Sequence, residues 1–120
     1  MTHKTGADLI SEAKSRVREL PAAEVKAMLG KGAQTVCLDV REANEFNLGH
    51  LPGALHIPRG SLELRIEGSV ARDATMIVYC ATGVRSALAV DTLQQIGYAN
   101  AHSLAGGWRE WVMAGGPVEE

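Results

Sequence analysis

One stretch of the chain, ATMIVYCATGVRSALAVDTLQQIG at residues 74–97, carries the pattern that decides the fold. Its first six residues are all apolar or β-branched, which is typical of a strand buried on both faces. From Ser86 to Ile96 apolar residues recur every three or four positions, and Gly97 is placed to end a helix in the left-handed conformation. The stretch therefore predicts a buried strand, a short loop and a helix.

Similar alternation extends on both sides of this stretch. We expect short apolar strands and amphipathic helices bounded by glycine and proline turns. The expected strands cover residues 35–40, 55–58 and 101–104, the expected helices 7–20, 21–30, 61–67 and 108–113, and a helical turn 41–46. The second of these helices should begin at Pro21 and end in a glycine turn at 30–32. Strands that alternate with helices indicate an α/β domain with a mostly parallel sheet.

Length and charge narrow the possible functions. The chain has 120 residues and a formal net charge of −2, so it forms one domain without a broad positive field for nucleic acid or an anionic membrane. No apolar run is long enough to span a bilayer, and the N-terminus lacks the apolar core of a secretory signal. We therefore expect a cytoplasmic protein without nucleic-acid or membrane partners.

The residues that commonly bind metals are scattered. The four histidines lie at positions 3, 50, 56 and 102, and neither cysteine belongs to a Cys-x-x-Cys pair, so we expect no metal. Cys37 lies inside an apolar strand and is expected to be a small core residue. His50 and His56 are expected to form hydrogen bonds within turns. Trp108 and Trp111 are expected to pack the last helix.

The loop that follows the strand at residues 74–79 contains the candidate reactive residue of the chain. Cys80 stands where a strand meets a helix N-terminus, and unpaired backbone N–H groups with the positive end of the helix dipole favour its thiolate. Gly83 permits the chain to turn back, Arg85 can close over a bound anion, and Ser86 is a natural N-cap. The alternative is that Cys80 merely ends a buried strand, as inert cysteines commonly do.

Three motifs carry a resemblance to a known family. Residues 39–58, DVREANEFNLGHLPGALHIP, resemble the upstream signature of rhodanese domains, and YCATGVRS at 79–86 is similar to their active-site loop. LAGGW at 104–108 resembles their C-terminal signature. The resemblance implies a three-layer α/β fold with a mostly parallel five-stranded sheet and helices on both faces. It places the domain at 21–120, with residues 1–20 as a helical extension.

The resemblance also implies a chemistry without cofactors. In rhodaneses the loop cysteine takes sulfane sulfur from a small donor anion as a persulfide and passes it to cyanide or a thiol. On this basis Cys80 and Arg85 are the expected catalytic residues, and Asp39 and Arg41 are expected to support them. The expected substrate contacts are Ala81, Thr82, Gly83, Val84, Ser86 and Arg59, although a solvated surface position is the more common case for an arginine such as Arg59.

Loop length and composition bear on the substrate. Four residues separate Cys80 from Arg85, whereas related cell-cycle phosphatases and arsenate reductases have one more, so the shorter ring favours sulfur over phosphate. Ala81 and Thr82 stand where thiosulfate-specialised members have basic residues. Polysulfides and small or protein persulfides are therefore as plausible as thiosulfate, and a protein acceptor stays open. The alternatives are a non-catalytic protein-binding module and, below it, a phosphatase or arsenate reductase.

Overall fold

A computed structural model describes residues 2–31 and 34–120, and it contains one five-stranded sheet. The strands are β1 (Glu19–Leu20), β2 (Thr35–Asp39), β3 (Leu55–His56), β4 (Thr75–Tyr79) and β5 (Ala101–Leu104). Their spatial order is β1-β5-β4-β2-β3, and every neighbouring pair is parallel. The expected α/β class and the five-stranded parallel sheet are therefore confirmed.

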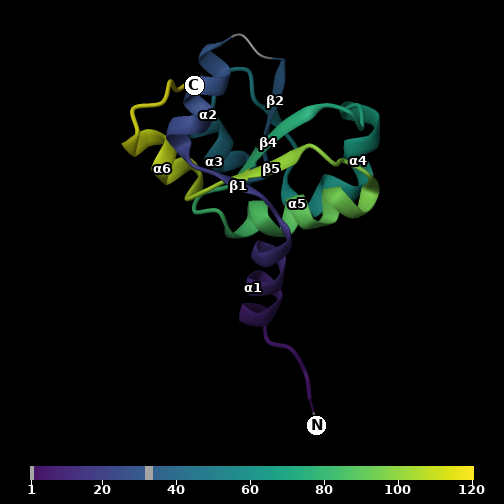
Figure 1. The fold of residues 1–120 in the computed structure, drawn as a ribbon. Coiled ribbons are helices and arrows are strands. Elements are labelled where there is room, and N and C mark those ends of the chain that lie inside the picture. Colours follow the sequence, from purple (N-terminus) through teal and green to yellow (C-terminus); the bar gives the residue numbers. More distant parts are fainter. Residues whose placement is uncertain (1, 32–33) are drawn as a thin grey trace.

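Helices cover both faces of the sheet (Figure 1). They are α1 (Gly6–Arg16), α2 (Ala22–Gly30), α3 (Ala43–Leu48), α4 (Leu62–Ser69), α5 (Val84–Ile96) and α6 (Gly107–Met113), with a 3₁₀ turn η1 (Arg59–Ser61) before α4. None of the helices in the described residues is long and apolar enough to cross a membrane.

The apolar run of β4 supplies both halves of the core. Successive strand residues point to opposite faces, so Met76 and Val78 pack against α4 and α5 while Ile77 and Tyr79 pack against α2 and α6. All four side chains are fully buried. A strand covered on both faces needs continuous apolar sequence, which is the pattern that predicted it. Because β4 lies at the centre of the sheet, the residue that directly follows it, Cys80, begins the loop from a fixed position.

The expected helix at residues 7–20 is wrong in its last turn. Helix α1 ends at Arg16, and Glu19–Leu20 forms edge strand β1, which pairs with β5 through Glu19–Ser103 and Leu20–Leu104. Pro21 explains the change, because a proline disfavours the helical conformation of the residue before it. The C-terminal part of the expected glycine turn at 30–32 lies outside the described residues.

Candidate functional site

Cys80 directly follows β4, and its sulfur faces backbone amides. The Gly83 N–H and the Ser86 N–H donate to its Sγ at N···S distances of 3.1 and 3.3 Å. The residue is only 1% exposed, so the thiol is enclosed by the loop. The position of Cys80 directly before a helix predicts this arrangement, because the backbone N–H groups at a helix N-terminus have no partner within the helix.

Gly83 gives the loop its shape. It is the N-cap of α5 and has a φ of +97°, a left-handed conformation that side chains other than glycine rarely adopt. A Cβ at this position would lie 3.3 Å from the backbone nitrogen of Gly106. The loop therefore turns at Gly83 and packs directly on the segment before α6.

Ser86 is not the N-cap that the sequence suggests. Helix α5 begins two residues earlier, at Val84, because Gly83 caps it. The Ser86 side chain instead lies 3.5 Å from Cys80 Sγ and 2.8 Å from the hydroxyl of Ser103 on β5. Both serines are fully buried. Ser103 was missed by the sequence analysis, although a small polar residue in a short apolar strand was a detectable signal.

The loop lowers the pKa of Cys80 in spite of its burial. Burial alone raises the pKa, but the Ser86 hydroxyl and the backbone N–H groups of Ser86, Thr82 and Gly83 stabilise the thiolate and outweigh it. Cys37 provides the internal comparison, because burial without such donors raises its pKa to about 11. The expectation that Cys37 is a buried core residue is confirmed.

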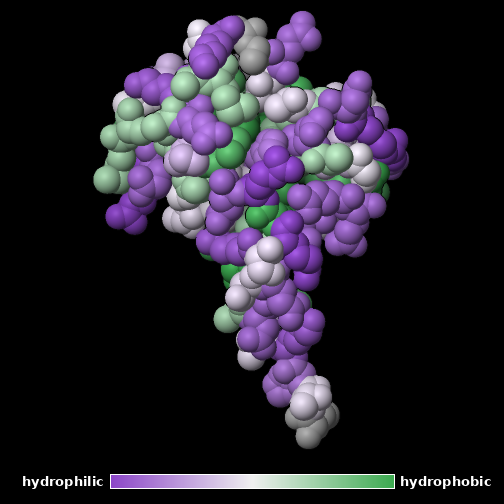
Figure 2. Space-filling view, in the orientation of Figure 1, coloured by the Kyte–Doolittle hydropathy of each residue, from purple (hydrophilic) through white to green (hydrophobic). Residues whose placement is uncertain are grey.

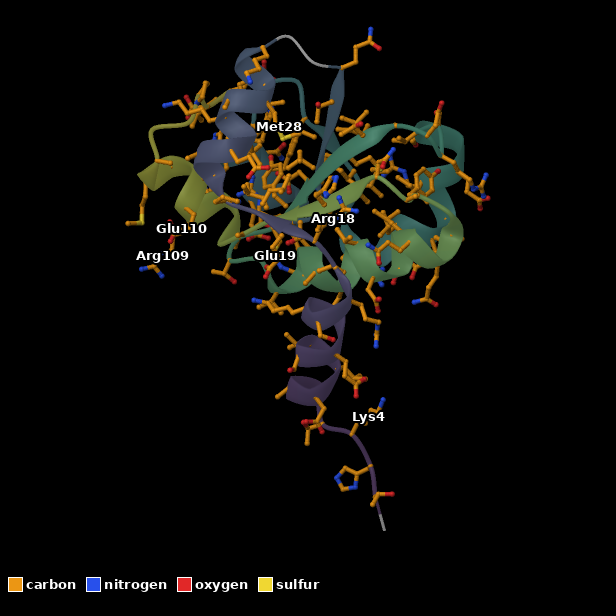
Figure 3. All side chains as sticks on the ribbon, viewed as in Figure 1. Lys4, Arg18, Glu19, Met28, Arg109 and Glu110 are labelled. Atoms are coloured by element: carbon orange, nitrogen blue, oxygen red, sulfur yellow. The ribbon has the colours of Figure 1, made fainter. Side chains whose placement is uncertain are left out.

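The N-terminus of α6 binds the backbone carbonyls at the start of the loop. The Trp108 N–H donates to the Cys80 carbonyl at 2.8 Å, and the Arg109 N–H donates to the Ala81 carbonyl at 3.2 Å. Gly107 permits this approach, since a Cβ there would lie 2.4 Å from the Cys80 carbonyl oxygen. The Arg109 side chain points away from the molecule (Figure 3), so only its backbone serves the loop.

Arg85 is paired with a residue of α3. Its Nη1 and Nη2 donate to the two carboxylate oxygens of Glu45 at 2.8 and 3.0 Å. The hydrogen bonds from Arg85 lower the pKa of Glu45 to about 2. The sequence analysis did not find this partner, which lies 40 residues away in the chain. Contact between Arg85 and a substrate anion stays a prediction.

Asp39 and Arg41 form a buried ion pair beside the loop. The Arg41 Nη2 donates to Asp39 at 2.7 Å and to the Gly49 carbonyl at 2.7 Å, and its guanidinium carbon lies 4.8 Å from the Trp108 ring centroid. The pair connects the end of β2 with the turn at Gly49 and with α6. That the pair supports the chemistry of the site stays a prediction.

The described contacts of Arg59 lead away from the loop. Its guanidinium donates to Glu63 on α4 at 2.9 Å and to Thr92 on α5 at 3.2 Å. Thr92 lies eight residues beyond Val84, which is about 12 Å along a helix. Among the described residues, Arg59 therefore connects α4 with α5. This geometry does not support the expected contact between Arg59 and a substrate.

The rim of the site is formed by Ala81, Thr82 and Val84, which are half-buried or exposed. None of the three carries a charge. His50 forms a hydrogen bond with the carbonyl of Phe46, four residues before it, at 2.9 Å, as expected for a contact within a turn. The same expectation is wrong for His56, which lies in β3 and forms its hydrogen bond at 2.8 Å with the carbonyl of Arg41, 15 residues away.

The chain is similar in sequence to known proteins. The putative sulfur carrier protein YrkF of Bacillus subtilis is 31% identical over 108 residues, which cover 90% of this chain and 58% of that protein. The chain thus spans somewhat more than half the length of such curated relatives. A sulfurtransferase of Allochromatium vinosum is 28% identical over 102 residues, covering 85% of this chain and 94% of that one.

Solved structures give the same result for the fold. A protein of unknown function from Rhodopseudomonas palustris, described as a possible tyrosine phosphatase, matches with a TM-score of 0.87 and 31% identity over 99% of both chains. The family model for the rhodanese-like domain matches residues 21–114, which include Cys80, its loop and the Gly106-Gly107 contact. The chain belongs to the rhodanese-like domain family.

Proposed function

We propose that this protein is a sulfurtransferase that carries sulfane sulfur as a persulfide on Cys80. The observation that carries the proposal is the position of Cys80 Sγ, which accepts hydrogen bonds from the N–H groups of Gly83 and Ser86 at the start of α5. Sulfurtransferase and sulfur-carrier names among its relatives support the same reaction class.

The reaction has two displacements. The Cys80 thiolate attacks the outer sulfur of a donor, a new S–S bond forms, and the donor's remaining part leaves with the electron pair of the broken S–S bond, as sulfite in the case of thiosulfate. A thiolate or cyanide then attacks the outer sulfur of the persulfide and releases the Cys80 thiolate. The net reaction moves one sulfur atom and needs no oxidant.

Ser86 has a separate role in this scheme. In the thiol form, Cys80 donates to the Ser86 hydroxyl oxygen, and a hydroxyl hydrogen can rotate to reverse the direction of the bond. In the thiolate form, Ser86 donates to the sulfur while Ser103 donates to Ser86. The two serines thus supply a hydrogen bond where the charge of the leaving Cys80 thiolate develops.

The charges around the loop favour donors other than thiosulfate. Ala81 and Thr82 are uncharged, and the Arg85 guanidinium is already paired with Glu45. A dianion would therefore gain little from this loop. We propose persulfide donors, because the –S–S⁻ group of a persulfide carries one negative charge where thiosulfate carries two.

Phosphatase activity is the second candidate, because the Rhodopseudomonas palustris structure is described as a possible tyrosine phosphatase. The four-residue spacing between Cys80 and Arg85 and the pairing of Arg85 with Glu45 argue against it. An assay with an aryl phosphate separates the two: we expect no turnover above the Cys80→Ser background.

The direct test is intact-mass measurement after incubation with polysulfide or thiosulfate. We expect the protein to gain one sulfur atom that cyanide or dithiothreitol removes, and Cys37→Ser to behave in the same way. Cys80→Ser should gain none. Sulfur retained by Cys80→Ser, or a wild-type protein that loads no sulfur from any donor, would leave a non-catalytic binding module as the better interpretation.

A further inference from the structure

Two guanidinium groups beside the loop are each matched by a carboxylate. Arg41 is paired with Asp39, and both of these side chains are buried. Arg85 is paired with Glu45 through two hydrogen bonds of 2.8 and 3.0 Å. The side chains of this second pair are 36% and 30% exposed, so it is the pair that an approaching donor can meet.

The carboxylate of Glu45 is placed by its own helix. Glu45 is the N3 residue of α3, and its Oε1 accepts a hydrogen bond from the Glu42 N–H at 2.9 Å, as in a capping box. The same oxygen accepts from Nη1 of Arg85. Helix α3 therefore presents to Arg85 a fixed negative charge that the loop itself does not contain.

The pairing cancels the charge of Arg85 and leaves it with free donors. A guanidinium has five N–H groups, and the hydrogen bonds to Glu45 use one on Nη1 and one on Nη2. Arg85 can therefore still donate to a bound donor molecule. An additional negative charge at the loop, however, is repelled by Glu45 while it is attracted by Arg85, so the two effects oppose one another.

The charge of Arg85 reaches the reactive sulfur. The hydrogen bond and the charge of Glu45 raise the pKa of Arg85, and the negative charge of the Cys80 thiolate raises it as well. Arg85 and the sulfur of Cys80 are thus close enough for their charges to interact. A change in the net charge of the Arg85–Glu45 pair therefore changes the electrostatic potential at Cys80.

Charges elsewhere on the molecule are spread out. The chain has 12 lysines and arginines and 14 aspartates and glutamates. Figure 2 shows hydrophilic residues distributed over α1 and over the rest of the face in view. Salt screens exposed charges beyond about 8 Å at physiological ionic strength, so the charges next to the loop have the greatest effect on a donor there.

We propose that Glu45 is the specificity-determining residue that makes the site discriminate against doubly charged sulfur donors. Glu45 has this role only if the proposed function holds, because the donor concerned is the one that loads Cys80. With Glu45 ionised, the second charge of thiosulfate meets a pair without net charge. Without that carboxylate, Arg85 keeps an uncompensated positive charge, which attracts a dianion more strongly than a monoanion.

The ratio of two loading rates tests this role. Loading of Cys80 is measured with thiosulfate and with mercaptoethanol persulfide, in wild type and in Glu45→Gln. Glutamine removes the charge but can still accept the capping-box hydrogen bond, so α3 keeps its N-terminus. The thiosulfate rate divided by the persulfide rate should rise roughly three-fold, the effect of one unit charge several ångströms away in water. In about 1 M salt the rise should shrink.

Two variants serve as controls. Glu45→Asp keeps the negative charge on a shorter side chain, and Glu63→Gln removes the charge of a carboxylate that pairs with Arg59 at 2.9 Å. Both should keep the wild-type ratio. An unchanged ratio in Glu45→Gln would overturn the proposal. An equal rise in Glu45→Asp or in Glu63→Gln would do so too, because the charge at position 45 would then not be the cause.

Alkylation of Cys80 separates this role from the proposed function. Iodoacetate and iodoacetamide differ by one negative charge, so the ratio of their rates at Cys80 reports the potential at the sulfur without any sulfur transfer. This ratio should also rise roughly three-fold in Glu45→Gln. If no donor loads sulfur but the alkylation ratio rises, the proposed function has failed. If sulfur loads and neither ratio changes, the function stands and the role of Glu45 is wrong.

Discussion

At the scale of single residues, the site depends on which donors surround a buried sulfur. Cys37 and Cys80 are both buried, yet burial raises the pKa of Cys37 to about 11 and the pKa of Cys80 is lowered. The difference comes from the Ser86 hydroxyl and the N–H groups of the loop. The opposite pKa shifts of these two buried thiols therefore come from the hydrogen bonds of the loop.

The pair of serines allows a test of this view. Ser103→Ala removes the partner that orients the Ser86 hydroxyl, at an O···O distance of 2.8 Å, while leaving both backbone donors in place. Loss of one hydrogen bond costs about 1 kcal/mol, so we expect a roughly five-fold lower rate of alkylation of Cys80 at neutral pH. The pH profile should shift upward with it. Ser11→Ala, at an exposed position on α1, is the control, and equal rates in both variants would show that Ser103 is only a packing residue.

At the scale of elements, the loop that contains Cys80 is held by contacts with two helices, α3 and α6. The ion pair between Arg85 and Glu45 joins α5 to α3, and the N–H groups of Trp108 and Arg109 join α6 to the loop carbonyls. None of the contacts is local in sequence. The loop can therefore be perturbed from either helix without changing its own residues.

The contact with α3 predicts a pH dependence. The pKa of Glu45 falls from 4.5 to about 2 in the folded protein because Arg85 donates to it. A carboxyl with a lowered pKa stabilises the folded state above pH 4.5, and this contribution is lost as the pH falls toward 2. Urea unfolding across this range should show a smaller loss of stability for Glu45→Gln than for wild type. Identical pH profiles would mean that the pair contributes nothing.

The contact with α6 predicts a steric effect. Gly107→Ala would bring a Cβ to 2.4 Å from the Cys80 carbonyl oxygen, whereas Gly53→Ala, at a comparable φ of +71°, meets no heavy atom within 4 Å. Both substitutions carry the left-handed backbone cost of about 1–2 kcal/mol. Gly107→Ala should lower the free energy of unfolding by more than this and impair sulfur loading, and Gly53→Ala should load normally. Equal losses in the two variants would contradict the packing of the loop on α6.

Local patterns predicted the elements better than the contacts between them. The strand within residues 74–79 and the helix that ends before Gly97 are predictable from sequence. A strand buried on both faces requires a continuous apolar run, and a left-handed cap favours glycine. Ser86 was assigned to the cap because serine favours that position, but Gly83 occupies it. The partnership of Arg85 with Glu45 was not predictable, because many carboxylates are available and only the folded chain selects one.

At the scale of the whole molecule, the parallel sheet gathers the site at one edge. The C-terminal ends of β2, β4 and β5 are neighbours, so the Asp39–Arg41 pair, Cys80 and the Gly106-Gly107 segment meet where α/β sheets commonly bind ligands. Helix α1 lies outside this arrangement and outside residues 21–114 of the family domain.

Tracing one labelled sulfur atom tests the central claim most directly. Cys37→Ser protein is loaded from polysulfide enriched in a heavy sulfur isotope, freed of donor, and mixed with a thiol acceptor. We predict that the label appears first on the peptide containing Cys80 and then, in equal amount, on the acceptor. A label that never resides on Cys80, or that remains there when acceptor is added, would contradict the account.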